Sequence, residues 1–289
     1  MDIRFLNSLI AVVDSGSIAD AARAERLTAA AVGQRVQALE RELGFALLSR
    51  HGHTATPTGA CLALLPRARR LVHEASLLQG DADPDGLSGR LRIGAISTAL
   101  TGMLPAALRE FTRRAPRVRP SIVPGTSKSL FYALQSGELD AAIVVSPPFA
   151  LPKTVRSMLL RVEPLLMLTG KGVRGSAAKL LGAGPYIRYD PNAWGGRHAA
   201  AWLADHGIEP PVLCDLDALE AIAMLVSDGM GVGLVPQWPG IERFTGECRV
   251  VSLAGATYQR EIVLLTNLDS DRPATLQTFS DALTEAPAQ

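Results

Sequence analysis

Cysteine is scarce in this chain, and long apolar runs and targeting signals are missing from it. Its three cysteines, Cys61, Cys214 and Cys248, form no C-x-x-C pair, so we expect no disulfide framework and a reducing compartment. No window reaches the roughly 18–20 apolar residues of a membrane-spanning helix. The first residues lack the basic front and the small-residue cleavage site of a signal peptide. These absences predict a soluble cytoplasmic protein that has no membrane partner.

A large net charge is also missing, but the charge is unevenly distributed. The 29 basic and 28 acidic residues leave a formal charge of +1. Residues 1–73 carry nine arginines against six acidic residues, a balance of +3, whereas the remaining 216 residues hold 20 basic and 22 acidic residues, a balance of −2. A small basic front end on a slightly acidic body favours a nucleic-acid-binding module joined to another domain. The length of 289 residues likewise predicts about two domains.

The sequence changes character near residue 80. Residues 1–79 show helical patterns with almost no strand signal, and residues 79–89, QGDADPDGLSG, have the composition of a linker. From RLRIGAI onward, β-branched apolar runs alternate with helical stretches. This alternation predicts an α/β fold with parallel sheets covered by helices.

The front end is typical of a helix-turn-helix. We predict a first helix over residues 2–15 that buries Leu9 and is ended by Gly16. Ser17 is expected to cap a short alanine-rich helix. Thr28 is expected to cap a third helix that runs to about Leu43.

The third helix has a polar face suited to the major groove of DNA. Val32, Val36 and Leu39 recur at helical spacing and should face the core. The more exposed positions are Ala29, Ala30, Gly33, Gln34 and Arg35. Small side chains permit close approach, glutamine bonds adenine, and arginine bonds guanine. An ordinary amphipathic surface helix is the plainer interpretation of the same pattern.

Residues 5–59 resemble the winged helix-turn-helix of LysR-type transcriptional regulators. The matching positions are Phe5, Val12, Gly16-Ser17-Ile18, Ala21-Ala22, Leu27-Thr28, Ala31-Val32, Gln34-Arg35-Val36, Leu39-Glu40, Leu43-Gly44, Leu47, Arg50 and Thr56 to Gly59. The resemblance implies that the protein binds double-stranded operator DNA through Ser17, Thr28, Ala29, Ala30, Gly33, Gln34, Arg35, Arg50, His53 and Thr54. Gly33 departs from the family, which usually has a serine there to touch a backbone phosphate, and Leu48 replaces a usual phenylalanine.

A wing and a long helix are expected to follow. The resemblance implies that Arg50 and the wing residues 51–54 lie along the DNA backbone or minor groove. His51 and His53 also suggest a metal site, but no third ligand is near them in the sequence, and we predict no metal. Over residues 57–78, a seam of Leu62, Leu65, Arg69 and Val72 has the spacing for pairing with a second copy. A helix packed on its own domain is the alternative.

Residues 90–289 resemble the two-lobed effector-binding domain of the same family, which has the fold of periplasmic solute-binding proteins. The markers are Gly89 to Gly94, Leu104-Pro105, the region of Pro116, Gly137 to Asp140, and Gly229 to Pro236. The resemblance implies three parts: a DNA-binding domain at residues 1–58, a linker helix and hinge at 59–89, and the effector domain. In the latter, lobe one is expected over residues 90–162 and 268–289, and lobe two over 163–267. The crossing segments are expected at Glu163-Pro164 and Thr266 to Leu268.

An effector site is expected where the strands of the effector domain end, because ligands of open α/β sheets bind outside the carboxyl ends of strands. Hydroxyls follow three predicted strands, at Ser97 and Thr98, at Thr126 and Ser127, and at Ser146. Hydroxyls and free N–H groups at a helix start bind anions, so a carboxylate-bearing metabolite is predicted as the effector. From lobe two, Arg188 or Arg197 is expected to add positive charge. Simple helix capping is the other interpretation of these hydroxyls.

The sequence thus predicts a DNA-binding transcriptional regulator that responds to a small organic anion. A two-lobed small-molecule-binding protein and a ligand-independent DNA-binding regulator are the alternatives. No nucleophile elbow, P-loop, zinc-protease or triad pattern occurs, so we expect neither an enzyme nor a cofactor. The resemblance further implies a homodimer or homotetramer, and it leaves RNA polymerase open as a further partner.

Overall fold

The computed structural model describes residues 1–51, 54–77, 86–253 and 258–285. The chain divides into two compact units, the first formed mainly by residues 1–84 and the second mainly by residues 85–135 and 139–289. The predicted linker at residues 79–89 lies largely outside the described residues. No helix among the described residues is long and apolar enough to cross a membrane.

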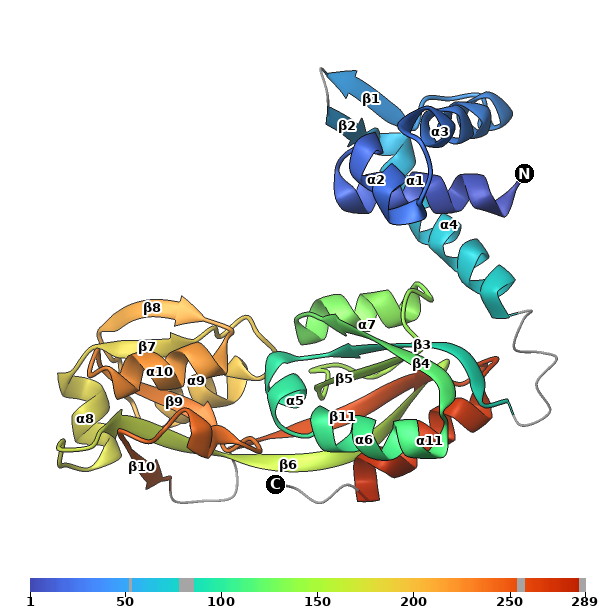
Figure 1. Cartoon of the computed structure of the whole chain (residues 1–289). Coiled ribbons are helices and arrows are strands. Elements are labelled where there is room, and N and C mark those ends of the chain that lie inside the picture. The colour runs from blue at the N-terminus through green and yellow to red at the C-terminus, as the bar shows by residue number, and fades with distance from the viewer. Residues whose placement is uncertain (52–53, 78–85, 254–257, 286–289) are drawn as a thin grey trace. The chain divides into compact units, whose positions relative to one another are not determined.

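The N-terminal unit is a three-helix cluster with a hairpin and a long helix (Figure 1). Its elements are α1 (Ile3–Ser15), α2 (Ile18–Glu25), α3 (Ala29–Leu43), β1 (Leu48–His51), β2 (Thr54–Pro57) and α4 (Gly59–Leu77). The predicted caps are confirmed: the Ser17 hydroxyl accepts from the Asp20 N–H at 3.0 Å, and the Thr28 hydroxyl accepts from the Ala31 N–H at 3.1 Å. Gly16 and Gly44 end α1 and α3 with φ of 73° and 82°, the left-handed region that glycine adopts without steric cost.

The core of this unit follows from helical periodicity. Leu9, Val32 and Leu39 are fully buried, as the spacing predicts. Glu40 ties the hairpin to α3, because its Oε1 accepts from the backbone N–H groups of Leu47 and Leu48 at 2.8 and 3.1 Å.

The seam predicted on the long helix is only partly exposed. Val72 packs against the core of its own unit, and Arg69 forms an ion pair with Asp14 of α1. The face that carries Cys61 and Ala68 is buried against the same core, so these residues and Val72 share one stripe of the helix. Leu62 and Leu71 instead stay exposed. The helix also begins at Gly59 rather than at Pro57, which lies in β2 opposite Leu48.

The C-terminal unit has two lobes joined by a nine-stranded sheet, whose strand order is β4-β3-β5-β11-β6-β9-β7-β8 with β10 beside β6 (Figure 1). Lobe one contains β3 (Ser88–Ala95), α5 (Ser97–Thr101), α6 (Leu104–Arg114), β4 (Arg117–Pro124), α7 (Ser127–Gln135), β5 (Ala141–Val145), the first half of β6 (Val155–Gly170), β11 (Gln259–Asn267) and α11 (Pro273–Glu285). Lobe two contains the second half of β6, α8 (Ala177–Ala183), β7 (Tyr186–Tyr189), α9 (Gly196–Asp205), β8 (Val212–Leu216), α10 (Leu219–Ser227), β9 (Val232–Pro236), a 3-10 turn (Ile241–Arg243) and β10 (Cys248–Ser252).

The prediction of parallel sheets holds for three strands of each lobe, but the crossing strands β6 and β11 run antiparallel to all their neighbours. Strands β3, β4 and β5 are parallel, as are β7, β8 and β9. The two crossing strands β6 and β11 run antiparallel to each other, because one leaves lobe one and the other returns to it. β6 changes partner from β11 to β9 between Pro164 and Leu165, beside the predicted crossing at Glu163-Pro164.

The second crossing differs from the prediction. β11 pairs with β5 and with the first half of β6 from Gln259 to Asn267, so the chain is back in lobe one by Gln259 rather than at Thr266 to Leu268. The sequence-based boundary failed because an apolar strand does not indicate which sheet it joins.

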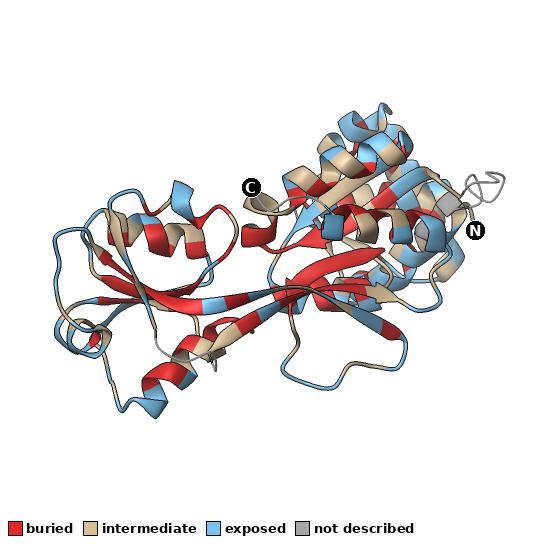
Figure 2. Cartoon of the chain, turned by 90° about the horizontal axis from the view of Figure 1, so that it is seen from below, coloured by how far each residue is buried: buried red, intermediate tan, exposed pale blue. Residues whose placement is uncertain are grey.

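The buried residues concentrate along the strands of both lobes (Figure 2). In lobe two, alternation along β6 points Leu165 and Met167 toward α8 and α9, and Leu166 and Leu168 toward α10. In lobe one, α6 and α11 pack together, with the rings of Phe111 and Phe279 5.4 Å apart.

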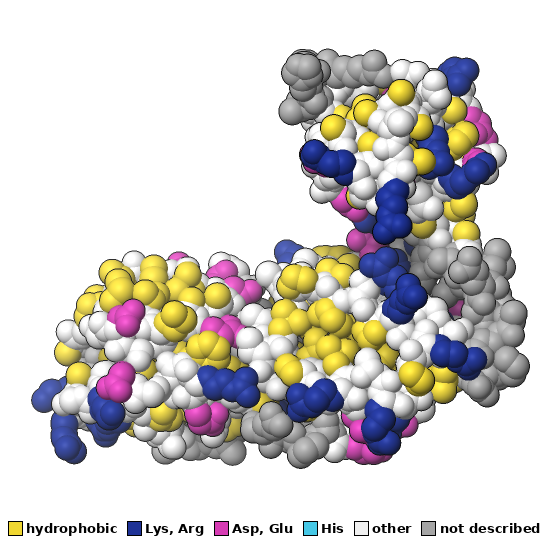
Figure 3. Space-filling model, in the orientation of Figure 1, with side chains coloured by type: hydrophobic (Ala, Val, Ile, Leu, Met, Phe, Trp, Pro, Cys, Tyr) yellow, Lys and Arg dark blue, Asp and Glu magenta, His cyan; other side chains and the backbone are white. Residues whose placement is uncertain are grey.

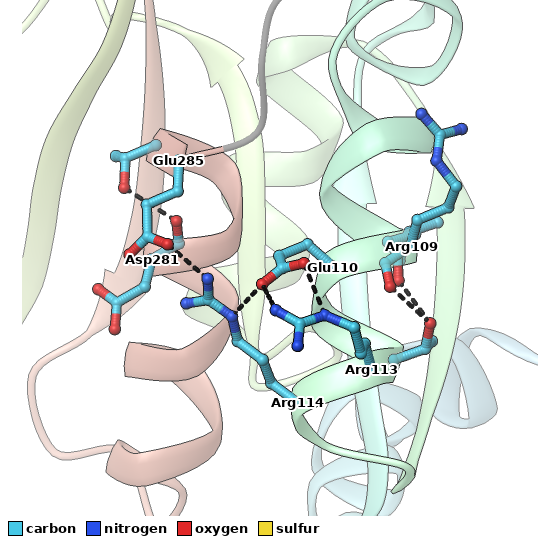
Figure 4. A network of polar contacts seen from close by, with 9 residues as sticks. Arg109, Glu110, Arg113, Arg114, Asp281 and Glu285 are labelled. Atoms are coloured by element: carbon cyan, nitrogen blue, oxygen red, sulfur yellow. Dashed lines mark hydrogen bonds and ion pairs between the residues drawn. The ribbon is translucent and has the colours of Figure 1, made fainter.

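A polar network also fastens α11 to α6 (Figure 4). Glu110 accepts from Arg113 and from Arg114, both at 2.5 Å, and Arg114 reaches on to Glu285 of α11. The hydrogen bonds from Arg113 and Arg114 lower the pKa of Glu110 to about 2. The C-terminal helix is thereby held on lobe one.

Candidate functional site

The N-terminal part of α3 presents an exposed surface of small and polar residues. Thr28, Ala29, Ala30 and Gln34 are exposed, and Gly33 is partly so. A Cβ added at Gly33 would meet no atom within 4 Å, so the helix surface is open there. Figure 3 shows arginine side chains spread over the visible face of this unit, which contains no lysine. Apart from Arg35, the third-helix residues predicted to contact DNA share this open surface.

Arg35 takes a different direction from its neighbours. Its Nη1 donates to the Ser8 hydroxyl at 3.2 Å and lies 3.4 Å from the Glu25 carboxylate. Ser8 is fully buried and itself donates to Glu25 at 2.6 Å. The expectation that Arg35 stands with the outward residues is therefore corrected, because a half-buried carboxylate draws the guanidinium toward α1 and α2.

The other described residues predicted to contact DNA lie in the cap of α2 and in the hairpin. The Ser17 hydroxyl is engaged in the cap of α2 and also donates to the Asp20 carboxylate at 2.6 Å. Arg50 and Thr54 lie in the hairpin strands β1 and β2, in register with Ala55 and His51 respectively. His53 lies outside the described residues.

A cavity of about 570 Å³ lies between the two lobes of the C-terminal unit. Lobe one contributes the residues that follow β3 and β4, and lobe two contributes those that follow β7 and β8. Its lining is Ile96, Ser97, Thr98, Gly125, Thr126, Ser127, Lys128, Val145, Tyr189, Asp190, Asn192, Ala193, Trp194, Gly195, Asp217, Ala218, Leu219 and Arg260. Four of the six residues predicted to bind an effector, Ser97, Thr98, Thr126 and Ser127, are brought together here.

Ser146 and Arg188 are not among the lining residues. Ser146 is held by its backbone, which donates to the Glu261 carbonyl at 2.8 Å and accepts from Arg197 at 3.2 Å. Arg188 pairs with Asp215, with Nε 2.5 Å from Oδ1. Strand alternation explains this placement, because Tyr189 faces the cavity and its neighbour Arg188 must then face the other side of the sheet.

Arg260 at the cavity was missed by the sequence analysis. Its side chain is 2% exposed, and its guanidinium binds Glu163 of β6 at 2.7 Å, Thr98 of α5 at 2.9 Å and Tyr189 of β7 at 3.3 Å. Burial raises the pKa of the Glu163 carboxyl, although Arg260 acts in the opposite direction. This arginine therefore joins both lobes through buried polar contacts beside the crossing strands.

Asp190 and Asp217 were missed as well, although the sequence held a signal for them. Both follow parallel strands, β7 and β8, so the strand-end rule that selected Ser97 applies equally to them. Asp217 lies close to the start of α10 but does not cap it, because the helix begins after Ala218 and has no side-chain cap hydrogen bond. Its carboxylate instead lines the cavity.

Gly196 allows α9 to start against the loop that carries Asp190. A Cβ at this position would collide with the Asp190 carbonyl oxygen. We therefore expect Gly196→Ala to shift this wall of the cavity and to lower the stability of the C-terminal unit by about 1–3 kcal/mol. Unfolding in guanidinium followed by tryptophan fluorescence measures this unit alone, because Trp194, Trp202 and Trp238 all belong to it.

Gly182→Ala in α8 is the matched control. A Cβ there meets no atom within 4 Å, so alanine should be neutral or should stabilise by up to about 1 kcal/mol. Equal stabilities of the two variants would contradict the close-approach argument.

Comparisons with known proteins identify the family. The model described as "Bacterial regulatory helix-turn-helix protein, lysR family" matches residues 3–62, and "LysR substrate binding domain" matches residues 84–288. The chain belongs to the LysR family of transcriptional regulators. The predicted family, fold class and DNA-binding regulatory function are thereby confirmed, and a regulator rather than an enzyme is established.

Individual relatives agree with this assignment. The LysR-family chain is 31% identical over 230 residues to the transcriptional regulator YofA of Bacillus velezensis, which covers 78% of this chain and 77% of YofA. It is 27% identical over 238 residues to the regulator CzcR of Bacillus cereus, which covers 82% and 81% of the two chains. Full-length CbnR, solved in complex with its target DNA, has the same fold with a TM-score of 0.69 at 22% identity, over 99% of this chain and 100% of CbnR.

Proposed function

We propose that this regulator responds to a small carboxylate-bearing metabolite bound in the cavity between its lobes. The observation that carries the proposal is the convergence of Ser97, Thr126, Ser127 and Lys128 at one wall of that cavity. The nine-residue helix α7 starts there. The Thr126 hydroxyl caps it by accepting from the Ser129 N–H at 3.2 Å, and the remaining N–H groups of the first turn favour an anion. Ligand binding across the cavity would favour one separation of the lobes and so change the regulator's action on DNA.

We also propose that the protein acts in the cytoplasm and that the exposed start of α3 enters the major groove of its operator DNA. Gln34 would supply base readout, with Thr28, Ala29, Ala30 and Gly33 at close approach and Ser17, Arg50, His53 and Thr54 nearer the backbone. Exposed Leu62 and Leu71 of α4 support pairing with a second copy, as a homodimer or homotetramer. A two-fold dimer would read two half-sites on the operator.

The experiment combines DNA and ligand binding by the full-length protein. The DNA upstream of its own gene is titrated across a salt series against scrambled competitor, with and without members of a panel of mono- and dicarboxylates that includes amino acids. We expect binding that survives the competitor and weakens with salt, and one carboxylate that changes it. That compound, at about 100 times its dissociation constant, should stabilise the C-terminal unit by about 2.7 kcal/mol.

Two results would contradict the proposal separately. Binding without preference over the scramble, with and without ligand, would argue against readout by α3 at this DNA. Specific binding with no panel member raising the stability would favour a regulator that acts without such an effector.

A further inference from the structure

The cavity walls carry opposite charges. Lys128 stands in the first turn of α7 in lobe one, whereas Asp190 and Asp217 follow β7 and β8 in lobe two. Arg260, the remaining charged lining residue, is already paired with Glu163 at 2.7 Å. A ligand therefore meets a cation from one lobe and two carboxylates from the other.

The side chains of the two aspartates form few hydrogen bonds with other described residues. Asp190 accepts from the backbone N–H and the side-chain amide of Asn192 at 2.9 and 3.1 Å, both through Oδ1. Within the described part of the chain, Asp217 forms no hydrogen bond or ion pair. Asp217 is an exposed residue, but partial desolvation and the negative charge of Asp190 raise its pKa, whereas the charge of Arg260 acts in the opposite direction. The two carboxylates therefore repel each other.

The nearby carboxylate of Asp215 has different surroundings from that of Asp217. It lies two residues before Asp217 at the end of β8, but it pairs with Arg188 and does not line the cavity. The hydrogen bond from Arg188 lowers the pKa of Asp215. Of these two aspartates, the one that forms no ion pair is the one that faces the cavity.

A plain carboxylate satisfies only half of this arrangement. It would be held at Ser97 and Lys128 but would leave Asp190 and Asp217 uncompensated, and a dicarboxylate would bring a further negative charge toward them. A cationic group on the same ligand would neutralise the lobe-two wall. The apolar lining residues Ile96, Val145, Trp194 and Leu219 suit a hydrocarbon portion.

We propose that the effector is an amino-acid-like zwitterion, with its carboxylate bound at Ser97 and Lys128 of lobe one and its ammonium group bound by Asp190 and Asp217 of lobe two. This inference rests on the proposed function and narrows its ligand class. A ligand charged at both ends bridges the lobes, so its binding is coupled to their separation.

The test uses matched ligands with the full-length protein. The common amino acids are each compared, by calorimetric titration, with the carboxylic acid that lacks the amine and with the amine that lacks the carboxylate. We expect at least one amino acid to bind and both of its counterparts to bind at least about 10-fold more weakly.

Variants then test the contribution of the lobe-two wall to ligand binding. Asp217→Asn should weaken binding of the amino acid roughly 10- to 100-fold, because the ammonium group loses a hydrogen bond to a charged carboxylate. The same variant should leave the affinity for the deaminated acid unchanged or higher, because a repelling charge is removed. Asp215→Asn, the matched control outside the cavity, should leave both affinities unchanged.

Each other outcome has a defined meaning. The zwitterion proposal would be overturned if a deaminated acid binds as tightly as its amino acid, or if Asp217→Asn leaves the affinity for the amino acid unchanged. The cavity would then be a site for a plain carboxylate. Binding confined to the mono- and dicarboxylates that carry no amino group would also overturn the proposal. Absence of binding by every compound in both series would overturn the zwitterion and the proposed effector response together.

Discussion

Replacing Arg260 with methionine is expected to lower the free energy of unfolding of the effector domain by about 3–5 kcal/mol, because it leaves the buried Glu163 carboxylate without its partner. Both side chains of this pair are at most 3% exposed. The arginine also donates to Thr98 and Tyr189, so polar atoms of both lobes lose a donor at the same time. Guanidinium-induced unfolding monitored by tryptophan fluorescence gives the measurement for this domain.

The effect should depend on pH in a defined direction. Burial raises the pKa of Glu163, and removing Arg260 removes the charge that opposes this rise. A group whose folded-state pKa is raised contributes stability that is present at low pH and lost as pH rises through that pKa. The loss caused by Arg260→Met should therefore be smaller at pH 5 than at pH 8.

Two further variants distinguish the stability cost of the unpaired buried charge from the cost of removing any arginine. The double variant Arg260→Met/Glu163→Leu should recover most of the lost stability, because no charge is then left buried alone. Arg249→Met removes a partly exposed arginine that donates to the Val173 carbonyl at 3.1 Å, and it should change stability by less than about 0.5 kcal/mol. A double variant as unstable as the single one would contradict the ion-pair argument.

Gln34→Ala and Arg35→Ala are expected to affect DNA binding in different ways, although the residues are adjacent. Gln34 is exposed on α3, so its removal should leave the domain's stability within about 0.5 kcal/mol and cost about 1–3 kcal/mol of discrimination at one base pair. Arg35 is drawn to Ser8 and Glu25. Its removal should lower stability by about 1–2 kcal/mol and weaken binding to specific and scrambled DNA alike.

Hydrogen exchange of the α3 amides and competition binding on single-base operator variants provide the two readouts. Gln37→Ala, at another exposed position of α3, is the control and should leave the sequence preference unchanged. Loss of sequence preference in Arg35→Ala with unchanged amide protection would instead mean that the guanidinium leaves Glu25 and reads a base.

Local features of this protein were determined by its sequence alone. The caps at Ser17 and Thr28, the glycine ends at Gly16 and Gly44, and the buried face of α3 depend on residues within a few positions of one another. Capping, glycine conformation and helical periodicity act over that range. The hydroxyls at Ser97 and Thr126 could be found for the same reason, because each follows its own strand.

The tertiary structure decided what depends on distant partners. Arg260 meets Glu163 across 97 positions of the chain, and Arg35 turns to Ser8 across 27. Whether β11 joins lobe one or lobe two, and hence where the chain crosses back, depends on strand pairing that a single apolar run does not encode. The charge pattern of the cavity likewise required both lobes, since Lys128 and Asp217 line one cavity only because the two halves of the sheet bring their strand ends together.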